Sequence, residues 1–291
     1  MMAGRRMVLW GALMAVSLMM AGCKANSDAA LEKSQASAAA SSMPTEQLDQ
    51  GTETYRGFVM DNVLHGETGD IHFHLYVPDS YDGTQPYALF ITLPGYQGLY
   101  FNGVGENIRT EDFAFEAQNY NARMIVAAPQ LNDWNQTSAD QTIALTKWLQ
   151  SAYDIDSSRV YIEGYSGGGE TLSLVLDKAS GLYTAALMCS SRWDGGYENL
   201  PSTKTPVYFV IGEGDEYYGP QPFEQAYASL HQTYQDNGLR DQEIDELLQL
   251  DVKPASYFSS SGIDNQHGGG GRLFSHDEQI MSWLFSKVKG E

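Results

Sequence analysis

A serine in a glycine-rich turn is the residue of this chain with the clearest potential for chemistry. Residues 159–170 read Arg-Val-Tyr-Ile-Glu-Gly-Tyr-Ser-Gly-Gly-Gly-Glu, a β-branched and aromatic run that breaks into G-x-S-x-G. On a tight strand-to-helix turn, the hydroxyl of Ser166 would project from the sheet and the N–H of Gly167 would point at its target. The flanking glycines leave the room that such a turn needs. This context predicts a nucleophilic serine, with an idle serine in a glycine-rich turn as the alternative.

The serine would need a base, and the base an orienting acid, because a serine hydroxyl alone is a poor nucleophile. The chain order serine, acid, histidine is typical of a serine in this kind of turn. Asp215 is the candidate acid, since it follows the apolar run 207–211 in a glycine-bearing loop that would hold a short carboxylate in place. Glu213 and Glu216 are its rivals, and an exposed acidic loop without a catalytic role is the alternative.

Three histidines follow the serine and could supply the base. His267 precedes four glycines, and we expect it in a loop between the last strand and the last helix, where its side chain could approach Ser166. His276 is expected near the N-terminus of the final helix, which disfavours the imidazolium that a base must briefly become. His231 falls inside a predicted helix. His267 is therefore preferred, with His276 second.

An acyl-transfer site also needs two N–H donors for the developing oxyanion. Gly167, directly after the serine, is one candidate. The other should come from the loop 94–98, Pro-Gly-Tyr-Gln-Gly, which follows a buried strand. The backbone N–H of Tyr96 is our choice for this second donor.

The elements that must position these residues alternate between strand and helix from residue 87 to the end. Periodicity predicts strands at 55–60, 71–77, 87–93, 123–128, 160–164, 185–189, 207–211 and near 256–258. It predicts helices at 111–121, 137–151, 168–178, 222–235 and 277–287, with Thr137 as the N-cap of the second. We therefore expect an α/β fold: a mostly parallel central sheet with an antiparallel N-terminal edge and helices on both faces.

Two segments fit this pattern less directly. His72 and His74 alternate on the second strand, and we expect them on a partly exposed sheet face rather than as metal ligands. Residues 241–250 form an acidic helical insertion that we expect outside the sheet.

The first fifty residues are typical of an export signal followed by a linker. Arg5 and Arg6 precede an apolar run over 7–21, and the sequence Met-Ala-Gly-Cys at 20–23 resembles the lipobox of bacterial lipoproteins. That resemblance implies a signal peptide over 1–22, a diacylated Cys23 and a membrane anchor on the extracytoplasmic side. An ordinary signal peptide that contains a cysteine is the alternative. Residues 23–51, rich in Ala and Ser, would be a flexible tether, and 52–291 the folded domain.

Composition narrows the possible partners. The formal net charge is −20, which disfavours nucleic acid and adhesion to anionic headgroups. Of two cysteines, Cys189 lies in an apolar run and is expected to be a buried thiol without a disulfide partner.

The serine turn, the downstream acid loop and the late histidine resemble the α/β-hydrolase superfamily over residues 55–288. Residues 153–161, Tyr-Asp-Ile-Asp-Ser-Ser-Arg-Val-Tyr, are similar to the branch of polyhydroxybutyrate-depolymerase-like and feruloyl-type esterases, and prolyl-oligopeptidase-like hydrolases share much of the pattern. The resemblance implies hydrolysis of an ester or amide through an acyl-enzyme, with no metal or organic cofactor.

The expected function is therefore that of a lipid-anchored serine esterase acting on a small-molecule or polymer ester with a carbohydrate, aryl or acyl group. A serine peptidase of the same fold is the closest alternative, and a non-catalytic binding lipoprotein is another. Aromatic residues at expected strand ends could line the cleft or simply anchor loops; the candidates are Tyr100, Trp134, Trp193 and Tyr217.

Overall fold

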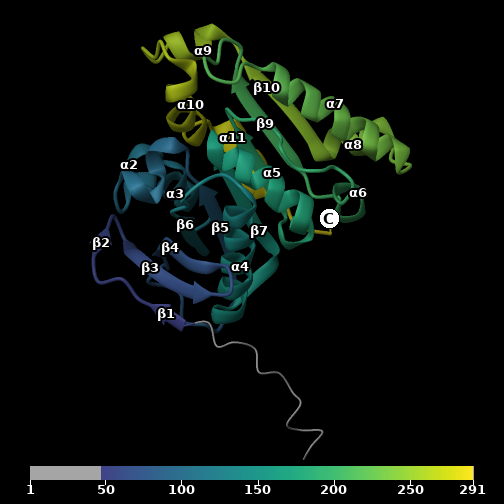
Figure 1. Ribbon diagram of the computed structural model, residues 1–291. Helices are drawn as coiled ribbons and strands as arrows, with labels where there is room; N and C mark the ends of the chain where they lie inside the picture. Colours follow the sequence, from purple (N-terminus) through teal and green to yellow (C-terminus); the bar gives the residue numbers. More distant parts are fainter. Residues whose placement is uncertain (1–46, 291) are drawn as a thin grey trace, which may run out of the picture. The chain divides into compact units, whose positions relative to one another are not determined.

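The computed structural model describes residues 47–290 (Figure 1). The predicted signal, Cys23 and most of the predicted tether lie outside the described residues. Residues 47–49, expected in the tether, form strand β1 (Gln47–Asp49) and pair with the sheet. No helix within the described range is long and apolar enough to cross a bilayer.

A ten-stranded sheet runs through the molecule in the order β1-β3-β4-β6-β5-β7-β8-β9-β10, with β2 paired to β3 (Figure 1). The pairs β1–β3, β3–β4 and β4–β6 are antiparallel. The pairs β6–β5, β5–β7, β7–β8, β8–β9 and β9–β10 are parallel. The mostly parallel sheet with an antiparallel N-terminal edge is thus confirmed. The remaining strands are β2 (Thr54–Tyr55), β3 (Phe58–Gly66), β4 (Gly69–Tyr76), β5 (Tyr87–Leu93), β6 (Met124–Pro129), β7 (Ile155–Tyr165), β8 (Ala185–Cys189), β9 (Val207–Gly212) and β10 (Leu248–Lys253).

Helices cover both faces of the sheet, as predicted. Strand β5 is buried throughout, and its residues alternate between two apolar layers: Leu89 and Ile91 face one, Ala88 and Phe90 the other. The first layer includes α4, α5 and α7, and the second α3 and α11. The helices are α2 (Glu106–Thr110), α3 (Phe113–Glu116), α4 (Gln136–Ala152), α5 (Gly167–Ala179), α6 (Leu200–Thr203), α7 (Gln221–Asp236), α8 (Asp241–Leu247), α9 (Ala255–Ser259), α10 (Gln266–Ser275) and α11 (Glu278–Ser286).

The C-terminal third differs from the sequence-based expectation at the edge of the sheet and in the segment that follows it. The acidic segment 241–250 is only partly outside the sheet: α8 ends at Leu247, and Leu248–Lys253 adds a parallel edge strand to β9. The strand expected near 256–258 is instead the short helix α9. Strand β10 is half-buried and follows its helix without a turn signal, so periodicity did not separate the two.

Smaller corrections concern caps and histidines. Asn135, not Thr137, caps α4, because its side chain accepts the N–H of Thr137 at 2.8 Å. His74 is fully buried rather than partly exposed; its Nδ1 accepts the N–H of Asp61 at 2.9 Å, and burial lowers its pKa to about 4. Cys189 is a buried free thiol, as predicted.

His65 links three strands at the N-terminal edge and gives a pH-dependent prediction. Its Nε2 lies 3.0 Å from Asp49 and its Nδ1 lies 2.7 Å from Asp70. The hydrogen bond with Asp49, then that with Asp70, raises the pKa of His65 above 6.5. Because the folded-state pKa is raised, this stabilisation is present below 6.5 and is lost as pH rises through the raised value.

We expect amides of β1 to be better protected from hydrogen exchange at pH 6 than at pH 9, after correction for intrinsic rates. His65→Gln should remove the difference. Equal protection of β1 in the unsubstituted protein at both pH values would contradict this assignment.

Candidate active site

Strand β7 ends and helix α5 begins at Ser166, in the strained turn that the motif predicts. Ser166 has φ 54° and ψ −123°, a backbone conformation that L-residues rarely adopt. Glycine is required on both sides because a Cβ on Gly164 would lie 2.5 Å from the carbonyl oxygen of Gly168. A Cβ on Gly168 would in turn lie 2.3 Å from that of Leu93. The chain therefore presents the serine hydroxyl at the carboxyl end of the parallel strands.

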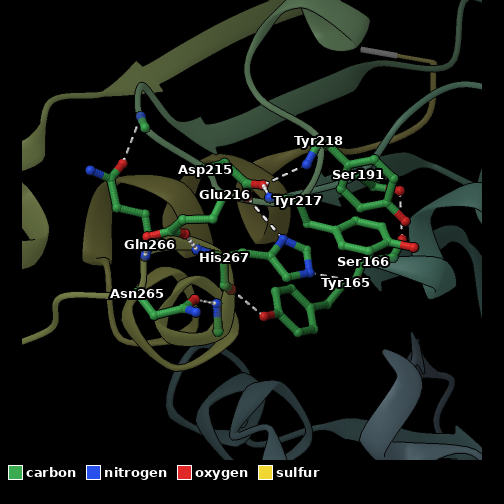
Figure 2. Close-up of polar contacts among 12 residues, drawn as sticks. Tyr165, Ser166, Ser191, Asp215, Glu216, Tyr217, Tyr218, Asn265, Gln266 and His267 are labelled. Carbon is green, nitrogen blue, oxygen red and sulfur yellow. Dashed lines mark hydrogen bonds and ion pairs between the residues drawn. The ribbon is translucent and has the colours of Figure 1, made fainter.

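The structure brings the three predicted residues together in one hydrogen-bonded chain (Figure 2). Ser166 Oγ lies 3.0 Å from Nε2 of His267, and Nδ1 of the same ring lies 2.9 Å from Oδ2 of Asp215. The carboxylate is fully buried, and the imidazole is largely buried. With Asp215 accepting from Nδ1–H, Nε2 is free to accept the serine proton.

Asp215 is held as a carboxylate by its own loop. The backbone N–H groups of Tyr217 and Tyr218 donate to its Oδ1 at 3.0 and 2.9 Å. Burial acts to raise the pKa of Asp215, but the hydrogen bond from His267 and those from the two backbone groups outweigh it, and the pKa lies below its ordinary value. The acid thus stays ionised at neutral pH.

His267 lies in the first turn of α10, not in a loop as expected. Each glycine costs about 1 kcal/mol relative to alanine inside a helix, which is why four in a row predicted a loop. Close packing explains them: a Cβ on Gly269 would lie 2.3 Å from Ile263, and one on Gly270 would lie 2.9 Å from Oγ of Ser190. A Cβ on Gly271 would lie 3.3 Å from the ring of Tyr165.

Of the rival residues, Glu216 contacts the backbone of His267 and not its ring, and the other three lie elsewhere. His276 follows α10 and contacts Asp112 at 3.2 Å, while Asp277, not His276, caps the final helix. His231 remains inside α7, against Tyr227. Glu213 accepts the N–H of Ala255 at 2.7 Å and so caps α9.

The two oxyanion donors expected from the sequence lie on the cleft. Tyr96 begins a short 3₁₀ turn in the loop that follows β5, and Gly167 begins α5. Within the described residues, neither backbone N–H has a protein acceptor. The N–H of Gly95 donates to Glu111 at 2.8 Å, which holds the start of the loop; burial raises the pKa of this carboxyl to about 8.

A cleft of about 950 Å³ opens over the serine. Of the aromatic candidates, Trp134 and Tyr217 line it, as does the side chain of Tyr96. Trp134 lies against the backbone of Gly167, where a Cβ would be 2.0 Å from the indole nitrogen. Tyr100 and Trp193 do not line the cleft. The ring of Tyr100 lies tilted against that of His72, with the two centroids 4.0 Å apart. Trp193 packs against Tyr197 and donates to the carbonyl of Gly195.

Sequence reasoning did not identify Glu170 and Arg192, which form a polar wall of this cleft together with Tyr218. The hydroxyl of Tyr218 donates to Glu170 at 2.7 Å, and Arg192 lies 3.3 Å from the same carboxylate oxygen. Glu170 could have been found, because a residue four positions after Ser166 on a helix lies on the same face. Arg192 follows β8 and reaches the cleft only through the sheet order, which the sequence does not show.

Residues 47–290 contain no group of three or more His, Cys, Asp or Glu side chains arranged to hold a metal ion.

Replacing Asp215 tests the orienting role. We expect Asp215→Asn to lower kcat for an ester substrate by about 10⁴-fold, because an amide can donate to Nδ1 and favour the wrong imidazole tautomer. Steady-state kinetics would measure the loss, with Asp194→Asn, an acid whose carboxylate pairs with Arg192 at 3.0 Å, as the comparison. A loss below tenfold for Asp215→Asn would show that this carboxylate does not orient the base.

The comparisons with known proteins concern the fold and the segment around the serine. The model of the prolyl oligopeptidase family matches residues 130–194, which include Ser166. A thermostable esterase shares 18% identity and a TM-score of 0.63 over 80% of this chain. Oligopeptidase B from Trypanosoma brucei shares 12% identity and a TM-score of 0.52 over 79% of the chain, and glucuronoyl esterase from Solibacter usitatus shares 9% and 0.51 over 74%.

The chain spans 63% of the length of that thermostable esterase, 37% of the oligopeptidase and 82% of the glucuronoyl esterase. A search of curated proteins finds no significant match. At these identities the likeness shows the fold, and the chain has the α/β-hydrolase fold that the motif resemblance predicted. The partial family match and the assembled serine, histidine and aspartate together support a serine hydrolase.

Proposed function

We propose that the protein hydrolyses carboxylic esters through an acyl-enzyme formed on Ser166. The observation that carries this proposal is the continuous hydrogen-bonded chain from Ser166 Oγ through His267 to Asp215. Its distances of 3.0 and 2.9 Å are within the range for proton transfer between a nucleophile and its base.

In the first half-reaction, His267 Nε2 takes the serine proton as Oγ attacks the ester carbonyl. The carbonyl oxygen becomes an oxyanion, for which the free N–H groups of Tyr96 and Gly167 are the donors. The imidazolium, stabilised by Asp215, then gives its proton to the alcohol oxygen as the C–O bond breaks. In the second half-reaction, water attacks the carbonyl of the acyl-enzyme while His267 takes a proton from it. The bond to Ser166 Oγ then breaks, the carboxylic acid product leaves, and His267 returns the proton to the serine.

The similarity to the thermostable esterase favours cleavage of esters over amides. Its TM-score of 0.63 is higher than the 0.52 for the oligopeptidase. The family match favours a peptidase as the second candidate. Turnover of p-nitrophenyl esters should be compared with that of aminoacyl and prolyl p-nitroanilides. Comparable kcat/KM on the amides would assign the protein as a peptidase. A lack of turnover and of labelling by a fluorophosphonate would favour a binding protein.

The cleft supports a substrate with a flat or cyclic group. Exposed rings of Tyr96 and Tyr217, at 53% and 73% exposure, flank the opening and provide surfaces for an aryl group or a sugar ring. We propose a carbohydrate, aryl or acyl ester, which a panel of acetyl, feruloyl and longer acyl esters would resolve.

We also propose, from the sequence alone, that the enzyme is exported and held to the membrane by lipid on Cys23. Metabolic labelling with a fatty acid should depend on that cysteine. Labelling that persists in Cys23→Ala would contradict the anchor.

A further inference from the structure

Glu216 connects the loop that carries the acid to the helix that carries the base. One carboxylate oxygen accepts the N–H of Gln266 at 3.0 Å, and the other accepts the N–H of His267 at 2.9 Å (Figure 2). These N–H groups belong to the first turn of α10 and have no acceptor inside the helix. In return, the side chain of Gln266 accepts the N–H of Gly214 at 2.9 Å.

We propose that Glu216 is a positioning residue for the base: it holds the backbone of His267 so that the imidazole lies between Asp215 and Ser166. This rests on the proposed function. Glu216 directly follows Asp215, so one rigid loop would hold both the ring and the backbone of the histidine. The contact of Asp215 with the imidazole and the clamp, by which we mean the hydrogen bonds of Glu216 to the backbone of α10, would then move together.

The rest of the environment explains why such a clamp is needed. Four consecutive glycines follow His267, and they give α10 little intrinsic tendency to form a helix. The backbone carbonyl of His267 accepts the hydroxyl of Tyr165, and the side chain of Asn265 caps the helix through the N–H of Gly268. The Glu216 carboxylate binds the backbone N–H groups at the start of α10 and so joins this helix to the loop that carries Asp215.

The carboxylate is suited to the position. A negative charge at a helix N-terminus is favourable, and a hydrogen bond to a charged acceptor is stronger than one to a neutral acceptor. Burial acts to raise the pKa of Glu216, but the hydrogen bonds from His267 and Gln266 lower it below its ordinary value. Glu216 does not touch the reacting atoms, so its effect must pass through His267.

Glu213 is a matched control in the same loop. It is also exposed and also accepts a backbone N–H at the start of a short helix, but that helix is α9, which carries none of the three proposed catalytic residues. Substitution of either acid by glutamine removes one negative charge and weakens one helix cap. Of these two acids, Glu216 contacts the backbone of the base and Glu213 that of Ala255.

The experiment measures kcat and KM of Glu216→Gln, Glu216→Ala and Glu213→Gln on one p-nitrophenyl ester. We expect about a tenfold lower kcat for Glu216→Gln, a larger loss for Glu216→Ala, and KM within twofold of the unsubstituted enzyme, because a displaced base slows the chemical step. Glutamine keeps one acceptor of two, which accounts for the graded loss. Glu213→Gln should lower kcat by less than twofold.

A second readout separates positioning from turnover. In the unsubstituted protein, the proton on His267 Nδ1 should give a downfield NMR resonance that broadens or shifts in Glu216→Gln and is unchanged in Glu213→Gln. Equal kcat losses in both Gln variants, or an unchanged kcat and resonance in Glu216→Gln, would overturn the proposal. If the unsubstituted protein turned over no ester, the proposed function would fail instead, and the resonance would still report on the clamp.

Discussion

Ser166→Ala is expected to abolish ester hydrolysis, with kcat reduced by up to about 10⁶-fold, because the proposed acyl-enzyme forms on this hydroxyl. The variant should fold normally: alanine occupies the strained turn with the same backbone constraint as serine, and only one oxygen is removed. Steady-state kinetics and the mass of the protein after fluorophosphonate treatment would measure the loss of turnover and of the covalent adduct.

Ser260→Ala is a suitable control, since that serine is exposed and its hydroxyl donates to the nearby carbonyl of Tyr257. It should keep both activity and adduct. If Ser166→Ala retained more than about one per cent of kcat, a different nucleophile would have to be found.

The second large effect concerns the base, where the sequence left two histidines open. We expect His267→Ala to lower kcat by about 10⁵- to 10⁶-fold, because the serine then has no proton acceptor at 3.0 Å. His276→Ala should change kcat by less than about threefold, because its ring contacts Asp112 at the surface. Kinetics on the same ester, with circular dichroism to verify folding, would compare the two variants.

The reverse order of losses would transfer the role of base to His276 and contradict the geometry. A small effect of both would indicate that a water or a carboxylate accepts the proton.

Local constraints explain why so much of the fold was predictable. Strand β5 was predicted with its exact bounds because burial on both faces produces an uninterrupted apolar run. The serine turn was predictable because its strained serine and close backbone contacts need glycines at fixed offsets. The acid could be placed because it follows a buried strand in a tight loop.

Other features depend on contacts between distant segments. Strand β10 was missed because its pairing with β9, not its own hydrophobic pattern, makes it a strand. Tyr100 and Trp193 are aromatic residues that follow strands ending at the active-site edge of the sheet. Their rings nevertheless pack against His72 and Tyr197 and do not line the cleft. Propensity does not contain this information.

The sequence by itself indicated the α/β class, the serine turn with Ser166 and the acid candidate Asp215, because each rests on residues close together in the chain. It preferred His267 to His276 as the base, but for an expected loop that the structure replaces with a helix. Only the tertiary structure decided that His267 begins a helix. Capping by Glu216, about 50 residues away, and close packing of the glycines outweigh their weak helical propensity. The tertiary structure also decided which aromatic and charged side chains surround the serine, since strand order and not chain order makes them neighbours.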